Sequence, residues 1–370
     1  MEILLDGVQA LIAEPGRIAM ILIGCVLMYL GIKKEYEPTL LVPMGLGTIL
    51  VNIPASGVLM TGTEPGPFQI LFDAGIETEL FPLLLFIGIG AMIDFGPLLA
   101  NPFLLLFGAA AQFGIFFVTI VATGVFGFDI AASAGIIAAA DGPTSIFVAN
   151  SLGSKYMGAI MVAAYSYMAL VPIIQPIAIK ACTTKKERAI RMTYRPGQVS
   201  QTAKILFPVT ICVVAGLIAP VSLPLVGFLM FGNLLRECGV LNSLSASAQN
   251  ELVNLISILL GLCVSVKMEY SEFLQFDTLI IMGLGLIGFI MDSVGGVMFA
   301  KLLNLFRKEK INPMVGAAGI SAFPMASRVV QKLATEEDPG NFILMQAAAA
   351  NVAGQIASVV AGGLVLGLLL

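Results

Sequence analysis

The sequence predicts an all-α polytopic membrane protein. Of its 370 residues, 58% are hydrophobic and only 11% are charged, whereas a soluble domain carries about 25% charged residues. The mean hydropathy of +0.98 comes from repeated apolar segments of about 20 residues, the length a helix needs to cross a bilayer. A helix satisfies its backbone in lipid, and the strands of a transmembrane barrel would alternate polar and apolar residues instead.

Hydropathy predicts about ten spanning helices and two interrupted apolar segments. The spans are expected near residues 17–32, 39–54, 80–97, 103–125, 157–180, 205–219, 222–236, 249–266, 277–300 and 341–370. The interrupted segments are 130–152, broken at Asp141-Gly142-Pro143, and 311–334, broken at Phe323-Pro324. Proline removes a helical hydrogen bond and glycine weakens a helix, so we expect unwound backbone at both breaks.

The distribution of basic residues indicates that both broken segments are re-entrant hairpins. If both crossed the membrane fully, the basic stretch 185–195 would lie opposite Lys33 and Lys34. Treated as hairpins, they leave most of the 19 lysines and arginines on the cytoplasmic side, as the positive-inside rule requires. The loop 55–79, which carries acidic and no basic residues, then lies outside.

The chain also divides into two similar halves. The stretch ASAGIIAAADGP aligns with GAAGISAFPMAS, pairing Gly135 with Gly319, and the same offset pairs Tyr167 with Asn351. Corresponding spans run in opposite directions, which is the inverted repeat of many ion-coupled transporters. The expected organisation is an N-terminal interfacial segment (1–16), a first half (17–182), a basic cytoplasmic linker (183–204) and a second half (205–370).

Several residue types that carry metal or nucleotide chemistry are missing from the sequence. It contains no histidine, and its five cysteines are scattered without a CxxC pair, which argues against zinc, haem and iron–sulfur sites. The phosphate-binding pattern GxxxxGK[ST] is also missing. We therefore expect neither a transition metal nor a nucleotide as cofactor, and no nucleic acid as partner.

Asp141 is the strongest candidate for a functional residue. A charged side chain at a helix centre costs roughly 2.5–3.5 kcal/mol, and a bound cation such as Na⁺ or H⁺ would compensate for it. Oxygen atoms of Ser145, Ser321 and Asn351, with carbonyls freed by the breaks, are the expected companions. Three structural alternatives stay open: Asp141 as a protonated structural acid, Ser145 bonding back to a helix carbonyl, and Asn351 joining two helices.

Three further polar residues lie within apolar segments. Tyr167 is expected in mid-span, where its hydroxyl needs a partner, and that partner could be the Asp141 carboxylate. Arg328 carries a planar fork that suits a carboxylate, although it could simply pair with Asp141. Asp292 is a weaker candidate because we expect it closer to the cytoplasmic end of its span.

Several motifs together resemble a known family, the β-subunits of biotin-dependent, Na⁺-translocating decarboxylases that act on oxaloacetate, methylmalonyl-CoA, glutaconyl-CoA or malonate. The motifs are AAADGPTSIF, AAYSYMALVPIIQP, FGNLLRECGV, MDSVGGVMFAKLLNLF, INPMVGAAGISAFPMASRVVQ and MQAAAANVAGQIAS. The resemblance runs from about residue 15 to the C-terminus. One departure is Cys238, where a serine is expected.

The resemblance implies functional positions at Asp141, Tyr167, Asn312, Gly316, Ser321, Arg328 and Asn351. It implies that Asp141, Tyr167 and Arg328 are catalytic, and that Arg328, Asn312 and Gly316 contact carboxybiotin carried by a partner subunit. It also implies an elevator-type fold, a homo-oligomer such as a trimer, and a place in the bacterial cytoplasmic membrane. The implied partners are biotin-carrier and carboxyltransferase subunits and a small membrane-anchoring subunit.

The function expected from these observations is a primary Na⁺ pump that decarboxylates carboxybiotin, consumes a proton and exports Na⁺. Arg328 is expected to hold the carboxylate of carboxybiotin and Tyr167 to deliver the proton. The alternatives are a Na⁺-coupled carboxylate symporter or a Na⁺/H⁺ antiporter that works alone, and a structural scaffold, which would not explain a charge at membrane depth.

Overall fold

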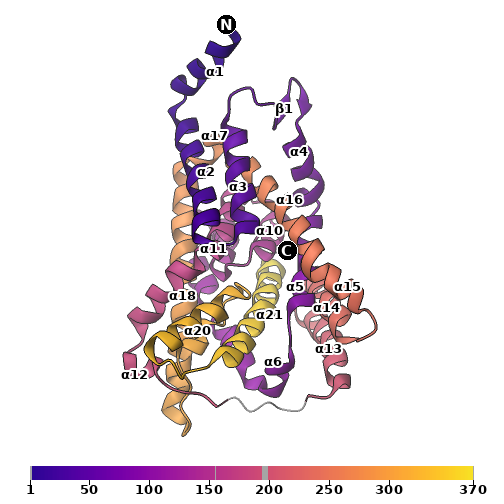
Figure 1. Cartoon of the computed structure of the whole chain (residues 1–370), viewed down its shortest axis with the longest axis vertical. Helices are drawn as coiled ribbons and strands as arrows, with labels where there is room; N and C mark the ends of the chain where they lie inside the picture. The colour runs from indigo at the N-terminus through magenta and orange to yellow at the C-terminus, as the bar shows by residue number, and fades with distance from the viewer. Residues whose placement is uncertain (1, 155, 194–198, 370) are drawn as a thin grey trace.

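The computed structural model describes residues 2–154, 156–193 and 199–369, and it is predominantly helical (Figure 1). The helices that correspond to predicted spans are α2 (Pro15–Lys34), α3 (Pro38–Asn52), α5 (Leu80–Met92), α7 (Leu105–Ala110) with α8 (Phe113–Phe126), α11 (Met157–Cys182), α13 (Gln201–Ile218), α14 (Leu223–Glu237), α16 (Val253–Val266), α18 (Phe276–Phe306) and α21 (Leu344–Leu369). The structure thus confirms an all-α architecture.

Seven stretches of helix in the described part are long and apolar enough to cross a membrane. Three of the ten predicted spans form shorter helices, namely α3, α5 and α14. The first of these ends at Asn52 and the second at Met92, two residues before Asp94. At 1.5 Å per residue, helices of 13 to 15 residues fall short of a hydrocarbon core of about 30 Å.

Short elements connect the long helices. They are α1 (Glu2–Ala13), β1 (Met60–Thr61), β2 (Glu64–Pro65), α4 (Pro67–Phe72), η1 (Asp73–Glu77), α6 (Gly96–Ala100), η2 (Pro102–Leu104), α12 (Lys185–Arg188), η4 (Pro220–Ser222), α15 (Asn242–Ser247), η5 (Ala248–Leu252) and α17 (Tyr270–Phe273). The two strands pair antiparallel, with Met60 opposite Pro65. In the N-terminal segment α1 is helical, but the side chains of residues 2–6 lie outside the described part, as do residues 194–198 of the linker.

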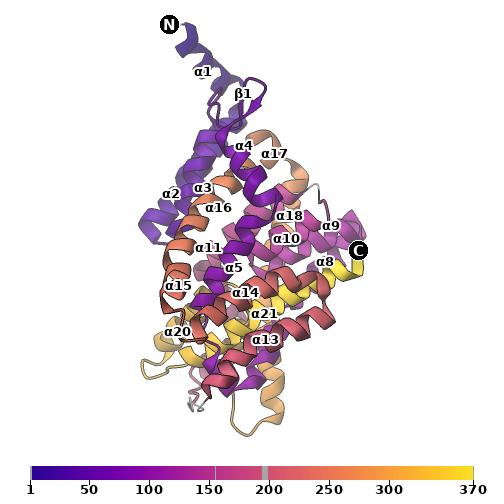
Figure 2. The same ribbon diagram turned by 90° about the vertical axis from the view of Figure 1, so that its right-hand side faces the viewer.

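Two groups of helices pack around separate hydrophobic clusters. The first group contains α2, α3 and α16, which lie side by side in both views (Figures 1 and 2). Glycines bring α2 and α3 close together, because a Cβ added at Gly24 would lie 2.7 Å from the carbonyl oxygen of Gly45. Small residues permit such close contact between helices in a membrane.

The second group contains α8, α11, α18 and α21 with both broken segments. Glycines again set the distances: a Cβ at Gly114 of α8 would overlap the carbonyl of Gly288 in α18, and a Cβ at Gly354 of α21 would overlap that of Gly319. The second group therefore encloses the backbone of the two breaks tightly.

The first broken segment consists of α9 (Phe128–Gly135), a 3-10 turn η3 (Ile136–Ala139) and α10 (Gly142–Ser151). The backbone breaks at Ala140, which has a φ of 50°, and at Asp141, which is extended. Pro143 follows in the first turn of α10, where its missing N–H costs no hydrogen bond. The sequence DGP thus ends one helix and begins the next, as predicted.

The second broken segment contains α19 (Met314–Ala317) and α20 (Met325–Glu337). Near its start, the Asn312 amide donates to the carbonyls of Arg188 (2.8 Å) and Ile190 (2.9 Å). Just after its end, the Asn341 amide donates to the same two carbonyls, each at 3.2 Å. The segment therefore returns to the end of the molecule at which it starts.

The linker after α11 is bonded to the end of this second segment. The Arg188 guanidinium is buried and lies 2.6 Å from the Glu337 carboxylate at the end of α20. Thr184 and Glu187 form a capping box that begins α12, satisfying backbone donors at the helix start. The ion pair between Arg188 and Glu337 holds the carbonyls of residues 188 and 190 in place for Asn312 and Asn341.

Candidate functional site

Asp141 lies at the first break, where it occupies the N-cap of α10 and is almost fully buried. One of its carboxylate oxygens, Oδ2, accepts three hydrogen bonds: from the Thr144 hydroxyl (2.7 Å), the Ser358 hydroxyl (2.8 Å) and the Gln355 amide (3.1 Å). The positive end of the α10 dipole also favours a carboxylate at this position. These contacts orient the carboxylate and stabilise its ionised form.

Asp141 lines a cavity of about 130 Å³ between the two groups of helices. Glu37, Thr39 and Ser257 line it from the side of α3 and α16. Asp141 and Ser321 line it from the side of the broken segments. A space of this size accommodates a few water molecules. The carboxylate is therefore buried in protein but faces a space that an ion can enter.

The second break lies against the first. The Ser321 hydroxyl donates to the Ala139 carbonyl (2.6 Å), which joins the two unwound stretches directly. Two amide side chains satisfy carbonyls of the second break: Asn351 donates to Ile320 (2.7 Å) and Gln175 to Ala317 (2.8 Å). The amide oxygens of Asn351 and Gln175 are buried and have no hydrogen-bond partner among the described residues.

The oxygen atoms at the two breaks have the chemistry of a site for a hard cation. They comprise a carboxylate, hydroxyls, backbone carbonyls and amide oxygens without partners, and such ligands suit alkali and alkaline-earth ions. A buried polar atom left unpaired costs about 1–3 kcal/mol, so the unpaired amide oxygens at Asn351 and Gln175 favour a bound partner. These kinds of oxygen suit Na⁺; Asp141 and Ser321 line the Asp141 cavity, whereas Asn351 and Gln175 do not.

Two of the predicted site residues make contacts away from the Asp141 carboxylate. The Ser145 hydroxyl donates to the Ile136 carbonyl (3.3 Å), which is the back-bonding alternative left open by the sequence. The Tyr167 hydroxyl donates to the Met282 carbonyl of α18 rather than to Asp141. Tyr165, two residues earlier, lies next to the break instead. A Cβ added at Gly142 would lie only 2.4 Å from the Tyr165 ring.

Arg328 is exposed on α20 and has no ion pair among the described residues. It does not pair with Asp141. Its charge acts on Glu37, which lines the Asp141 cavity: burial raises the pKa of the Glu37 carboxyl, and the electrostatic attraction of Arg328 partly offsets that rise. The two side chains come from different groups of helices.

Asn312 and Gly316 make structural contacts in this conformation. The Asn312 amide nitrogen donates to two carbonyls of the linker, and its oxygen accepts from the Met314 N–H (3.1 Å). Gly316 packs on Gly296 of α18, whose carbonyl leaves no room for a Cβ. Neither residue lines the Asp141 cavity, so the structure does not bring them to the carboxylate.

Several residues of the site were missed by sequence reasoning. Gln355 and Ser358 contact Asp141, and together with Asn351 they have the spacing i, i+4, i+7. That spacing places side chains on one helical face, so the polar stripe on α21 was a readable signal. Gln175 and Glu37 gave no comparable signal, because only the tertiary packing brings them to the breaks.

A second buried acid, Asp292, differs from Asp141 in its surroundings. It lies in the middle of α18 and is fully buried; one of its oxygens accepts from the Gly114 N–H at the start of α8. Its other oxygen has no partner among the described residues. Asp292 does not line the Asp141 cavity, and glycine contacts between α8 and α18 enclose it.

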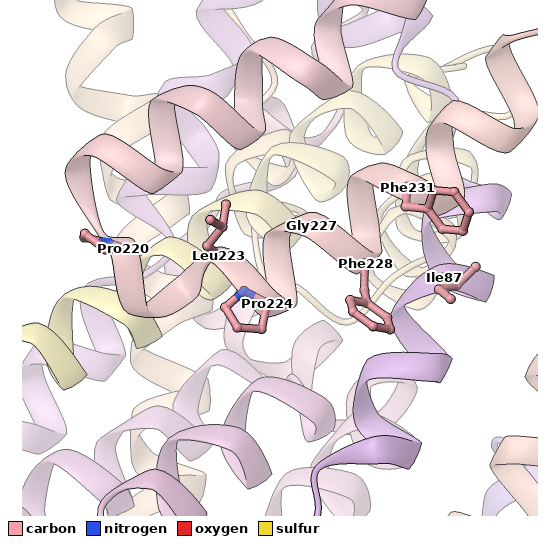
Figure 3. Close-up of a pocket in the computed structure, with 7 residues that line it drawn as sticks. All are labelled: Ile87, Pro220, Leu223, Pro224, Gly227, Phe228 and Phe231. Atoms are coloured by element: carbon pink, nitrogen blue, oxygen red, sulfur yellow. The ribbon is translucent and has the colours of Figure 1, made fainter.

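A larger cavity of about 690 Å³ is apolar and offers no ion site. It is formed by α14 and the preceding turn, with Ile87 of α5 (Figure 3). The lining side chains are Ile87, Pro220, Leu223, Pro224, Phe228 and Phe231, and Gly227 opens the space between them. It suits hydrocarbon rather than a charged ligand.

Known proteins share this sequence over nearly its whole length. The family described as Na⁺-transporting oxaloacetate decarboxylase β subunit matches residues 16–369. Methylmalonyl-CoA decarboxylase subunit β of Propionigenium modestum is 46% identical over 375 residues, covering 95% of each chain. Glutaconyl-CoA decarboxylase subunit β of Acidaminococcus fermentans is 46% identical over 95% of this chain and 92% of its own. Oxaloacetate decarboxylase β chain 2 of Salmonella typhi is 42% identical over 99% and 98%. The chain therefore belongs to the family of Na⁺-transporting oxaloacetate decarboxylase β subunits.

Proposed function

We propose that this chain, as the membrane subunit of a decarboxylase Na⁺ pump, decarboxylates carboxybiotin carried by a partner subunit and couples the reaction to Na⁺ export. The observation that carries the proposal is the Asp141 carboxylate, held between two broken segments and facing a cavity. Moving one charge against about 150 mV costs roughly 3.5 kcal/mol, so export requires an energy source, and decarboxylation supplies it.

Na⁺ is the ion that Asp141 binds in this proposal. The Asp141 carboxylate supplies the charge, and Ser321 and Asn351 supply neutral oxygens from the second break. Ser145 remains a member of the proposed set, although it reaches an ion only by giving up its bond to the Ile136 carbonyl. The unpaired oxygens of Asn351 and Gln175 support the proposal, since cation binding would satisfy them.

Carboxybiotin binds at Arg328, which is exposed on α20 and free of a carboxylate partner among the described residues. Its guanidinium holds the carboxylate of carboxybiotin by a bidentate contact. Asn312 and Gly316 contribute by holding the second segment against the linker and α18. Glu37 feels the charge of Arg328 and competes with carboxybiotin for it.

In the reaction, the bond between the ureido nitrogen and the carboxylate carbon breaks, CO₂ leaves, and the nitrogen takes up a proton. We assign proton delivery to Tyr167, whose hydroxyl is held by the Met282 carbonyl. Na⁺ near Asp141 would favour release of that proton, because a nearby cation stabilises a phenolate. Asp141, Tyr167 and Arg328 are thus the proposed catalytic residues.

The assembly follows from the same proposal. Biotin-carrier and carboxyltransferase subunits would load the biotin, a small membrane-anchoring subunit would hold them at the membrane, and this subunit would form a homo-oligomer such as a trimer in the bacterial cytoplasmic membrane. The position of the cavity between two groups of helices supports an elevator-type motion of one group against the other. The two similar halves of the sequence support an inverted repeat.

Reconstitution tests the function directly. The subunit is purified with its co-purifying partners, placed in vesicles and assayed for ²²Na⁺ uptake during decarboxylation. We expect a biotinylated partner on an avidin blot, and we expect added avidin to stop uptake by sequestering biotin. Uptake by the solitary chain, unaffected by avidin, would show that it is a carrier and not a pump subunit.

A further inference from the structure

A polar cavity of about 510 Å³ lies at the end of the molecule that carries the basic linker, separate from the Asp141 site. Four stretches of chain form it: residues 101–104, 190–193 and 307–311, and Gln346 at the start of α21. None of these residues lines the Asp141 cavity, and none contacts Na⁺ or carboxybiotin in the proposed reaction. Its chemistry therefore needs a separate explanation.

The charge of the cavity is predominantly basic. Arg191, Arg307 and Lys310 line it, against one acid, Glu309. Arg191 is neutralised by Asp338, with N–O distances of 2.6 and 2.9 Å, and this pairing lowers the pKa of the Asp338 carboxyl. The other two basic groups have no carboxylate partner among the described residues. They leave a net attraction for an anion.

Two features show that the cavity is built rather than a chance gap between loops. The Arg307 guanidinium lies over the ring of Phe103, 4.8 Å from its centroid, which fixes its position by a cation–π contact. The Gln346 side chain, only 5% exposed, lines the cavity with both amide atoms lacking hydrogen-bond partners among the described residues. Burying an amide without hydrogen-bond partners is unfavourable, so the N–H groups of Gln346 are free to donate to a bound anion.

The surroundings identify the source of the anion. Three of the four stretches lead directly into apolar residues that are exposed: Leu105 and Leu106, Leu305 and Phe306, and Leu344 and Met345. Phe306 is 83% exposed and immediately precedes Arg307. Basic side chains at the end of an exposed apolar helix lie at the level of the lipid headgroups.

From this arrangement we infer that the cavity binds the phosphate of an anionic phospholipid. Arg307 and Lys310 contact the phosphodiester, the Gln346 amide donates to it, and the acyl chains lie along the exposed apolar residues of α18 and α21. A bound headgroup would tie the end of α18 to the start of α21, next to the start of the second broken segment. The inference does not depend on the proposed reaction.

The test uses the full-length chain in neutral detergent, to which phosphatidylglycerol or phosphatidylcholine is added at equal mole fractions. Thermal unfolding is followed by circular dichroism. We expect phosphatidylglycerol to raise Tm more than phosphatidylcholine does. Each basic group near an anionic surface contributes about as much as a fivefold change in affinity, so the double variant Arg307→Gln/Lys310→Gln should need roughly 30-fold more phosphatidylglycerol.

The control is Lys185→Gln/Lys186→Gln, which removes two exposed cytoplasmic charges outside the cavity and should behave as wild type. If the first double variant does not fold, Gln346→Met tests the cavity without changing its charge. We expect this variant to show a smaller difference between the Tm shifts produced by phosphatidylglycerol and phosphatidylcholine. If inorganic phosphate alone reproduces the Tm shift, the cavity binds free phosphate from solution, and the assignment to a phospholipid is overturned.

The inference would be overturned if the two lipids raised the Tm of wild type equally. It would also be overturned if the two double variants lost the same share of the Tm shift that phosphatidylglycerol produces. Loss of partner subunits from the Arg307→Gln/Lys310→Gln variant without any lipid preference would do the same, and would reassign the cavity to an acidic protein surface.

Discussion

The two broken segments compensate for their lost helical backbone in different ways. The first places a carboxylate, Asp141, at its break and surrounds one of its oxygens with side-chain donors from α10 and α21. The second has no charge at its break, and neutral amides from α11 and α21 satisfy its carbonyls. One break thus supplies charge and the other supplies dipoles.

For the proposed Na⁺ site, this difference means that the cation would be held without a permanent ion pair. A carboxylate opposite an arginine would be neutralised at all times, but Arg328 is exposed and does not pair with Asp141. Neutral oxygens stabilise a cation only while it is bound. We therefore expect the charge and the dipoles to have separable effects on transport.

The largest effect is expected from removing the charge. Asp141→Asn should abolish Na⁺ uptake in reconstituted vesicles, because breaking a buried, hydrogen-bonded charge interaction costs about 2–5 kcal/mol. Asp292→Asn is the matched control: it removes a buried acid that does not line the cavity. It should lower the free energy of unfolding by about 1–3 kcal/mol while preserving uptake. Wild-type uptake by Asp141→Asn would contradict the proposed ion site.

The next effect separates two tyrosines of α11, of which Tyr165 lies against the first break and Tyr167 donates to the Met282 carbonyl of α18. Tyr167→Phe should lower turnover at saturating carboxybiotin by about 100-fold or more, as expected for loss of a general acid, and should alter the pH profile. Tyr165→Phe removes a buried hydroxyl without a partner among the described residues. It should shift the Na⁺ concentration for half-maximal activity and leave the pH profile unchanged. If Tyr165→Phe alone changes that profile, Tyr165 is the donor instead.

Removing a dipole at the second break should have a smaller effect. Asn351→Leu leaves the Ile320 carbonyl without its donor, at a cost of about 1–3 kcal/mol, and removes an oxygen proposed to bind Na⁺. We expect the Na⁺ requirement to rise by roughly tenfold. Gln112→Leu is the control, since Gln112 is also a buried amide bonded to a carbonyl but lies outside the breaks. If the two variants raise the Na⁺ requirement equally, Asn351 serves only packing.

The smallest effect concerns the mouth of the cavity. Glu37→Gln removes a carboxylate that attracts Arg328, so the KM for free carboxybiotin should fall by up to about fivefold, the range of a weak attraction between partly exposed charges. Burial raises the pKa of Glu37, so acidification protonates it early. The wild-type KM should therefore fall as the pH falls, whereas the variant KM should not. Glu35→Gln, a neighbouring exposed acid, should behave as wild type.

Local features of the chain were readable from the sequence. The apolar segments predicted the helices, and Asp141-Gly142-Pro143 predicted the first break, because proline and glycine limit a helix whatever surrounds them. The second break at Phe323-Pro324 was likewise predicted from proline. The return of the second segment to its starting end agrees with the count of basic residues.

The tertiary structure alone decided which side chains meet at the breaks. It placed Tyr165 rather than Tyr167 against Gly142, bonded the Asn312 amide to carbonyls of the linker, and brought Glu37 to the Asp141 cavity, where the charge of Arg328 acts on it. These contacts join residues far apart in the chain, and they depend on how each helix is rotated and how closely glycines allow it to approach its neighbours. A sequence shows which polar groups must find partners in the membrane, but helix packing determines which partners they find.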